Sequence, residues 1–236
     1  MKQGFTLIEI LVVIAVIAIL MGILVPAASR AREQAKVTAV NMELRQIGLA
    51  LEMYFDDNHK FPPTQADCMT GLLADHLYQL PGTLVTGHYL PSMPHEKAMS
   101  SSIEDRFNRG HTYKYRSVGE IIVDRNKIDE YIWAKLWIPD GFPSMSSVAE
   151  EEGRWHPNPN EGSRFLENHS SFALTCPVSW VVFSLGPRFD SDWLEEKLGS
   201  ENRYPVPKQL WYTPEERRGF IVRMRLKNGT QIGSFE

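Results

Sequence analysis

The N-terminal apolar segment constrains the fold of this chain more than any other feature. The segment from Phe5 to Val25 is apolar except for Thr6 and one charged side chain, Glu9. A helix rises about 1.5 Å per residue, so this segment is long enough to cross a hydrocarbon layer of about 30 Å. Lys2 precedes it on the short side, which predicts a cytoplasmic N-terminus and an exported remainder. The sequence therefore predicts one membrane-spanning helix at the N-terminus.

Three simpler explanations of this segment account for less of it. A secretory signal peptide has a shorter apolar region that ends in a small-residue cleavage site, and Val25-Pro26-Ala27 is a poor site of that kind. A plain signal anchor explains the length but not Glu9. A helix buried in a soluble protein is rarely apolar on every face over such a length. Glu9 is the discriminating residue, because a charge within a membrane span is costly and is usually functional.

The residues around this carboxylate resemble a known processing signal. Gly4-Phe5-Thr6-Leu7-Ile8-Glu9, followed by the apolar run, is similar to the signal of type IV pilins and type II secretion pseudopilins. The resemblance implies cleavage between Gly4 and Phe5 by a prepilin peptidase, followed by N-methylation of Phe5. It also implies that Glu9 pairs with the terminal amine of a neighbouring subunit. The physics agrees with this role, because an unpaired carboxylate in a filament core of low dielectric is costly.

Beyond the apolar segment the pattern predicts that the helix continues. Pro26 lies where helices of this family often bend, and proline kinks a long helix without necessarily ending it. Residues 26–57 are amphipathic, so we expect their apolar side to pack on the exported domain. The expected apolar stripe recurs at spacings of three or four, and three further residues broaden it: Ala35, Ala39, Met42, Gln46, Leu49 and Met53, then Leu44, Ile47 and Leu51.

The rest of the chain predicts one exported α+β head with a small antiparallel sheet. Strands are expected at 112–118, as a half-buried strand, and at 120–124, 131–138 and 178–185; a short helix is expected at 72–80. Asn228-Gly229 predicts a hairpin within 220–235, and 139–164 is interpreted as a long surface insertion. The predicted pilin-like organisation is a leader (1–4), a transmembrane helix (5–25), its amphipathic continuation (26–57) and the head (58–236).

Short motifs in the head resemble the major pseudopilin of type II secretion. They are Val182-Phe183-Ser184-Leu185-Gly186-Pro187, Tyr54 with Asn58 and Phe61-Pro62, and Tyr212-Thr213-Pro214 ahead of Gly219-Phe220-Ile221-Val222-Arg223. This resemblance implies a calcium site in the loop after Gly186, with Asp190 and Asp192 as candidate ligands. Arg188 stands where the resemblance places the first carboxylate. A calcium site and a solvated acidic loop therefore both remain open.

Two cysteines, Cys68 and Cys176, lie in the exported part of the chain. Disulfides persist in oxidising compartments, so these residues are candidates for a bridge. Two buried thiols explain them equally well, and both interpretations stay open.

Neither charge nor motifs indicate catalysis or nucleic-acid binding. The net charge of −4, from 25 basic and 29 acidic residues, provides no basic field for nucleic acid. No nucleophile elbow, phosphate-binding loop or dinucleotide fingerprint is present. His95-Glu96 begins like a metalloprotease motif, but Met99 occupies the position of the second histidine. We therefore expect no enzyme, and no cofactor apart from the candidate calcium.

The sequence thus predicts a structural subunit of a pilus-like filament. The resemblance implies three partners: other pilin or pseudopilin subunits, the prepilin peptidase and methyltransferase, and an inner-membrane assembly platform. It implies a single-pass inner-membrane location, with a periplasmic or extracellular head, before assembly. A secretion pseudopilus, a type IV pilus and an uptake system all remain open, as do a major and a minor subunit. The alternative is an exported enzyme or ligand-binding domain on a membrane anchor, which would not need Glu9.

Overall fold

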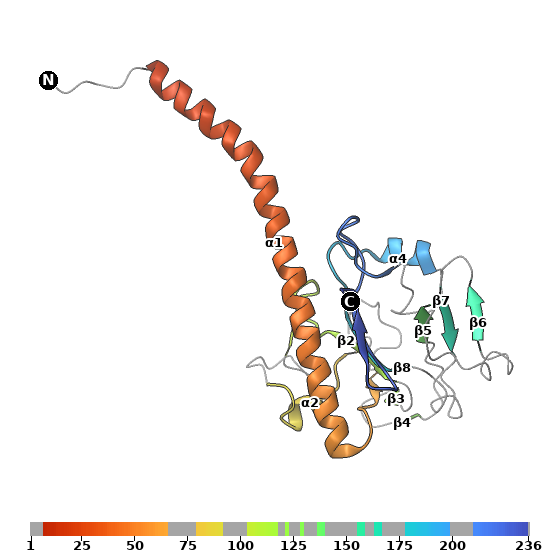
Figure 1. The fold of residues 1–236 in the computed structure, drawn as a ribbon. Coiled ribbons are helices and arrows are strands. Elements are labelled where there is room, and N and C mark those ends of the chain that lie inside the picture. Colours follow the sequence, from red (N-terminus) through yellow and green to blue (C-terminus); the bar gives the residue numbers. More distant parts are fainter. Residues whose placement is uncertain are drawn as a thin grey trace. The chain divides into compact units, whose positions relative to one another are not determined.

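The computed structural model describes residues 7–65, 79–91, 103–117, 121–122, 128–129, 136–139, 155–158, 163–166, 178–198 and 210–235 (Figure 1). The chain divides into two compact units, Met1–Ala39 and Val40–Glu236. The predictions for Gly4, Phe5, Cys68 and Cys176 lie outside the described residues, as does most of the helix expected at 72–80.

One long helix, α1 (Leu7–Asn58), opens the described part of the chain. Pro26 lies inside this helix, so the chain continues past it in helical conformation. Proline has no backbone N–H, and one helical hydrogen bond is therefore missing at this point. The Ser29 hydroxyl donates to the Pro26 carbonyl at 2.8 Å. At the other end, the Asn58 side chain donates to the Tyr54 carbonyl at 2.9 Å and satisfies one of the last carbonyls of the helix.

The second unit contains a four-stranded antiparallel sheet in the order β10-β9-β8-β2. Its strands are β2 (Lys114–Ser117), β8 (Val178–Ser184), β9 (Ile221–Leu226) and β10 (Gln231–Gly233). Tyr115 lies opposite Val182, Val182 opposite Arg223, and Arg223 opposite Gly233. The long helix and this sheet confirm the predicted α+β class and match the pilin fold.

The hairpin predicted around Asn228-Gly229 is present between β9 and β10. Gly229 has φ +89°, a conformation that glycine adopts without steric cost. The Asn228 side chain accepts a hydrogen bond from the Thr230 amide at 2.9 Å, and the Leu226 amide donates to the Thr230 carbonyl at 2.8 Å. The turn residues therefore set the register of the last two strands locally.

The buried face of α1 differs from the expected stripe. The residues of α1 that are fully buried are Val37, Val40, Leu44, Ile47 and Leu51. Three main members of the expected stripe are exposed instead: Met42 (53%), Leu49 (63%) and Met53 (55%). The predicted main stripe was therefore wrong, although Leu44, Ile47 and Leu51 were correctly expected on the packed side.

A glycine in α1 shows why the row of buried residues, rather than the expected stripe, faces the sheet. Gly48 is buried within α1, and a Cβ added there would lie 3.2 Å from the Trp180 ring and 2.9 Å from the Gln231 side-chain oxygen. The helix thus lies close to β8 and β10 at a position where it lacks a side chain. Both rows repeat every three or four residues, so spacing alone could not decide which one packs.

Strand β2 was expected to be half-buried, and this was wrong. Tyr113, Lys114, Tyr115 and Arg116 are all buried, so both faces of the strand are covered. The alternation of aromatic and basic residues suggested one solvated face. Instead, the buried carboxylate of Asp105 attracts the Lys114 ammonium electrostatically.

The remaining elements are short. The strands β1 (Thr64–Gln65), β3 (Ile121–Ile122) and β4 (Ile128–Asp129) form one small sheet; β5 (Leu136–Pro139), β7 (Ser163–Leu166) and β6 (Trp155–Asn158) form another. Strand β6 and the start of β7 fall within the segment interpreted as a surface insertion, so that insertion contains paired strands. Two short helices are α2 (Thr83–Thr86) and α4 (Ser191–Leu198).

Candidate assembly site

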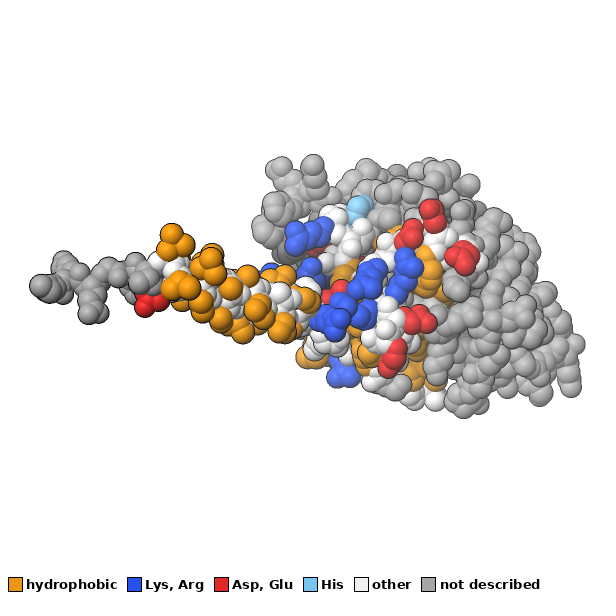
Figure 2. Space-filling model, turned by 90° about the horizontal axis from the view of Figure 1, so that it is seen from above, with side chains coloured by type: hydrophobic (Ala, Val, Ile, Leu, Met, Phe, Trp, Pro, Cys, Tyr) orange, Lys and Arg blue, Asp and Glu red, His pale blue; other side chains and the backbone are white. Residues whose placement is uncertain are grey.

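Exposed apolar side chains cover the first part of α1 (Figure 2). Leu7 is 83% exposed, Ile23 71% and Val25 62%, and the other large apolar residues between them are about half exposed or more. Such a surface is unfavourable in water and is stable against lipid or against other apolar helices. By length and composition, α1 is the one helix among the described residues that could cross a membrane.

Glu9 is the acidic residue in the first turn of this helix. It is exposed and is surrounded along the chain by exposed apolar residues. The N-terminal end of a helix carries partial positive charge, which favours a carboxylate in the first turn. The structure therefore places a negative charge at the start of an apolar helix surface, as the sequence predicted. The pairing of Glu9 with a neighbouring Phe5 amine stays a prediction, because Phe5 lies outside the described residues.

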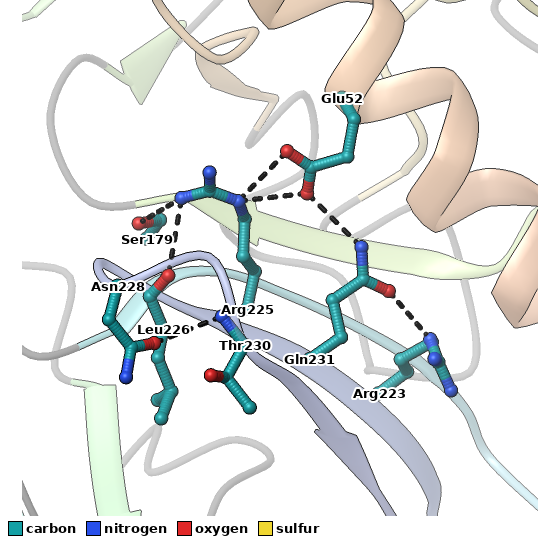
Figure 3. Close-up of polar contacts among 8 residues, drawn as sticks. All are labelled: Glu52, Ser179, Arg223, Arg225, Leu226, Asn228, Thr230 and Gln231. Carbon is teal, nitrogen blue, oxygen red and sulfur yellow. Dashed lines mark hydrogen bonds and ion pairs between the residues drawn. The ribbon is translucent and has the colours of Figure 1, made fainter.

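In the second unit, a hydrogen-bonded network joins the C-terminal part of α1 to the last two strands (Figure 3). The Arg225 Nε atom donates to both carboxylate oxygens of Glu52, at 2.8 and 2.9 Å. Its Nη1 atom donates to the Ser179 hydroxyl at 3.3 Å and to the Leu226 carbonyl at 3.2 Å. One guanidinium thus contacts α1, β8 and β9 together.

Gln231 extends this network to β10. Its side-chain nitrogen donates to Glu52 at 3.1 Å, and its side-chain oxygen accepts a hydrogen bond from Arg223 Nε at 2.9 Å. Glu52 therefore accepts hydrogen bonds from residues on two adjacent strands (Figure 3). Charge-assisted hydrogen bonds of this kind are stronger than neutral ones, so the network fixes the helix on the sheet.

Aromatic rings surround the same guanidinium. The Arg225 Cζ atom lies 5.0 Å from the centre of the Phe61 ring and 5.6 Å from that of Phe55. The two rings stack on each other with centres 4.6 Å apart, and Phe61 meets Trp180 edge to face at 6.4 Å. A cation near ring faces gains electrostatic attraction, and the rings shield the ion pair from water.

A second ion pair holds the middle of α1 within the same unit. Arg106 Nε donates to the Glu43 carboxylate at 2.8 Å, and the buried Tyr113 hydroxyl donates to the other oxygen of Glu43. Burial and the hydrogen bond to Glu43 raise the pKa of Tyr113 well above its ordinary value. The hydrogen bond to Glu43 likewise raises the pKa of Arg106. Glu43 therefore anchors residues 103–113 to the helix.

The residue next to this arginine joins the same segment to the end of β8. Asp105 is fully buried and accepts hydrogen bonds from the Ser184 hydroxyl at 2.7 Å, the Phe107 amide at 2.9 Å and the Leu185 amide at 3.1 Å. Burial raises the pKa of the Asp105 carboxyl, while these hydrogen bonds oppose the rise. The start of the Ser184-Leu185-Gly186 segment is therefore held by protein groups.

In the loop after Gly186, the carboxylate of Asp190 is held by protein donors. One carboxylate oxygen of Asp190 accepts the Asp192 amide at 3.1 Å, and the other accepts Arg218 Nη2 at 3.3 Å. A hard cation needs several oxygens directed at one point. Among the described residues no group of three histidine, cysteine, aspartate or glutamate side chains is placed to hold a metal. Asp190 and Asp192 are near neighbours, but no shared ligand set forms around them.

Glu9 and the acidic loop could be identified from the sequence, whereas Glu52, Arg225 and Arg218 were missed. Glu52 and Arg225 are separated by 173 positions, so spacing within one element could not connect them. One signal was available: Arg223 and Arg225 alternate with apolar residues on the closing strand. An arginine on the inner side of a sheet needs a carboxylate partner, which the polar residues of α1 can supply.

The comparisons with known proteins cover about a quarter of the chain. Residues 1–25 match the family model described as the prokaryotic N-terminal methylation motif. The chain is 44% identical over 64 residues to the type II secretion system core protein G of Pseudomonas aeruginosa, covering 27% of this chain and 45% of that protein. It is 45% identical over 64 residues to the type IV wide pilus major component PilA4 of Thermus thermophilus, covering 27% and 49%.

A further relative shows the same extent of similarity. The type II secretion system core protein G of Escherichia coli is 38% identical over 63 residues, covering 27% of this chain and 43% of that protein. In each case the chain matches less than half the length of its relative. No solved structure matches the chain with statistical significance. The resemblance to pilins and pseudopilins is therefore confirmed, and the methylation motif lies in the N-terminal segment that contains Glu9.

Proposed function

We propose that this chain is a structural subunit of a pilus-like filament, either a type II secretion pseudopilus or a type IV pilus. The observation that carries the proposal is the methylation motif together with an exposed apolar helix segment, residues 7–25, whose one charged side chain is Glu9. One relative is named as a pilus component and the others as core proteins of type II secretion. These names indicate a structural role rather than turnover.

The proposed life cycle begins in the membrane. The apolar part of α1 is stable in lipid, which suits a single-pass inner-membrane subunit with an exported head. A prepilin peptidase then cleaves between Gly4 and Phe5, and the new terminal amine is methylated. During assembly on an inner-membrane platform, contacts with lipid are replaced by contacts with helices of neighbouring subunits.

Glu9 sets the axial position of each subunit relative to its neighbours when lipid contacts are replaced by helix contacts. Cleavage creates a positive charge at Phe5, and the carboxylate of a neighbouring subunit can neutralise it. In the low dielectric of a helical bundle, an unpaired charge costs about 3–5 kcal/mol. The pairing therefore favours one axial arrangement of subunits and is repeated at every subunit.

A second exposed surface supports assembly through α1. Met42, Leu49 and Met53 project from the helix on the side that the head does not cover, and each is more than half exposed. Their spacing of seven and four residues places them along one side of the helix. We propose that this row, like the apolar segment before it, contacts neighbouring subunits in the filament.

The test is the substitution Glu9→Val in the full chain. The variant should insert in the membrane and fold its head, because the change removes a charge from an apolar helix. Polymer recovered by shearing or cross-linking should fall at least tenfold, while monomer accumulates in the membrane fraction. Glu215→Val, which removes an exposed carboxylate from the head, is the matched control and should assemble normally. Normal polymer yield from Glu9→Val would contradict the role of Glu9 and favour an anchored enzyme or binding domain.

A further inference from the structure

Arg218 lies against the loop in which the sequence resemblance implied a calcium ion. Its Nε atom donates to the Arg188 carbonyl at 3.1 Å, and its Nη2 atom donates to Asp190 Oδ2 at 3.3 Å. Its Cζ atom lies 4.9 Å from the centre of the Trp193 ring. One guanidinium therefore contacts a backbone carbonyl, a carboxylate and an aromatic ring within six residues of the loop and α4.

The remaining oxygen of Asp190 is also in use. Asp190 precedes α4, and its Oδ1 atom accepts the Asp192 amide while its carbonyl accepts the Leu194 amide at 3.2 Å. This is the geometry of an N-cap, in which a side-chain oxygen satisfies an amide of the first helical turn. The carboxylate thus has one oxygen on the helix N-terminus and the other on Arg218. Both oxygens of this carboxylate therefore accept hydrogen bonds from protein donors, one of which is itself a cation.

The backbone of the loop has two features at the point where Arg218 contacts it. Arg188 has φ +57°, a conformation that residues other than glycine seldom adopt, so its surroundings must hold it there. The two segments also approach closely beside it, because a Cβ added to Gly186 would lie 1.9 Å from the Gly219 carbonyl oxygen. Gly219 immediately follows Arg218. The close glycine contact and the arginine contact therefore fasten the same two segments.

We infer that the Arg218 guanidinium is the built-in cation of this loop and takes the structural place that a calcium ion would have. It neutralises Asp190 and satisfies the Arg188 carbonyl, which a metal would do through oxygen ligands, and it also lies over the Trp193 ring. A covalently attached cation cannot dissociate. The loop is therefore held independently of the calcium concentration outside the cell.

The experiment measures amide hydrogen exchange of residues 186–198 in the full chain in detergent, with millimolar calcium or with a chelator. In the wild-type chain, exchange should be the same in both solutions. Arg218→Ala should raise exchange of the loop amides about 5- to 10-fold, the combined effect of losing a surface ion pair and a cation–π contact. Arg218→Lys should fall between the two, because lysine keeps the charge but lacks the planar fork. Arg109→Ala, at an exposed arginine outside this contact, is the matched control.

Asp190→Asn provides an independent variant if Arg218→Ala does not fold. Asparagine keeps an oxygen for the Asp192 amide and remains a good N-cap, but it loses the charge that faces Arg218. Exchange should rise in residues 186–190 and stay low in the first turn of α4. Protection of the wild-type loop that increases with calcium and is lost with chelator would overturn the inference. So would an Arg218→Ala variant that exchanges like Arg109→Ala.

Discussion

Arg225 shows how a single side chain can join elements that lie far apart in the sequence. Its side chain is 14% exposed and that of Glu52 29%, so the pair is shielded but not fully desolvated. Full burial of an ion pair costs more in lost hydration than it returns, whereas exposure leaves little attraction. The stacked Phe55 and Phe61 rings shield this ion pair in part, so that it is neither fully buried nor fully exposed. Arg225 thus combines an ion pair, hydrogen bonds and ring contacts at the end of α1.

Tyr115 offers a test of burial at the same scale. Its hydroxyl is buried and donates to the Pro62 carbonyl at 2.7 Å. Burial raises the pKa of Tyr115 above the ordinary value of 10.0. Below pH 10 the residue is neutral in both states, so its contribution to stability is complete. Above pH 10 the unfolded chain loses the proton while the folded chain keeps it, and the free energy of unfolding falls by about 1.4 kcal/mol per pH unit.

The substitution Tyr115→Phe should remove this alkaline loss. At neutral pH the variant should be less stable by about 1 kcal/mol, since the Pro62 carbonyl keeps a hydrogen bond from the Ser117 hydroxyl at 2.8 Å. Between pH 10 and 11.5 the gap between the two proteins should close or reverse. Urea unfolding followed by tryptophan fluorescence measures both. A gap that stays constant with pH would show that Tyr115 ionises as readily in the folded chain as in the unfolded one.

At the scale of elements, local signals predicted more than long-range packing did. The apolar run gave the start of α1, and Asn228-Gly229 gave the hairpin, because each signal lies within the element it specifies. The packed face of α1 was assigned to the wrong row, because two apolar rows with the same spacing lie on one helix. Only the sheet, with Trp180 against Gly48, selects between them. The solvated face expected for β2 failed for the same reason, since Asp105 comes from another segment.

The two rows of α1 give a direct comparison of their roles. Leu44 is fully buried and Leu49 is 63% exposed, although both are leucines on the same helix. Leu44→Ala should lower the free energy of unfolding by about 2–5 kcal/mol, because it leaves a cavity in the core. Leu49→Ala should change it by less than about 0.5 kcal/mol. Chemical unfolding of the two full-length variants measures the difference. Equal losses would contradict the packing of α1 described above.

For the candidate sites, too, local sequence signals were more informative than contacts between distant segments. Glu9 could be singled out from the sequence because of the motif and the apolar run beside it, and its pairing stays a prediction. Whether Asp190 can bind a metal could not be predicted from the sequence, because this depends on which hydrogen-bond donors reach its two carboxylate oxygens. Asp192 supplies one donor from the next turn, but Arg218 supplies the other from 28 positions away. The sequence therefore indicated an acidic loop, and the fold determined what neutralises it.

At the scale of the whole molecule, the chain combines a helix surface that water does not favour with a head held by ion pairs and a sheet. The exposed apolar residues of α1 are difficult to explain in a protein that stays in solution as a monomer. They are expected in a subunit that moves from a membrane into a bundle of like helices. Processing at the N-terminus is the step that would prepare the chain for this transfer, since it creates the amine that Glu9 would meet.

The most direct measurement is mass spectrometry of the N-terminal peptide of the chain recovered in a sheared polymer fraction. We expect a peptide that begins at Phe5, carries an N-methyl group and keeps the whole apolar segment. The same chain in cells lacking the prepilin peptidase should begin before Gly4 and be absent from the polymer fraction. A mature chain that begins near Ala27 or Ala28 would instead show removal of a secretory signal, and it would contradict the proposal that this protein builds a filament through α1.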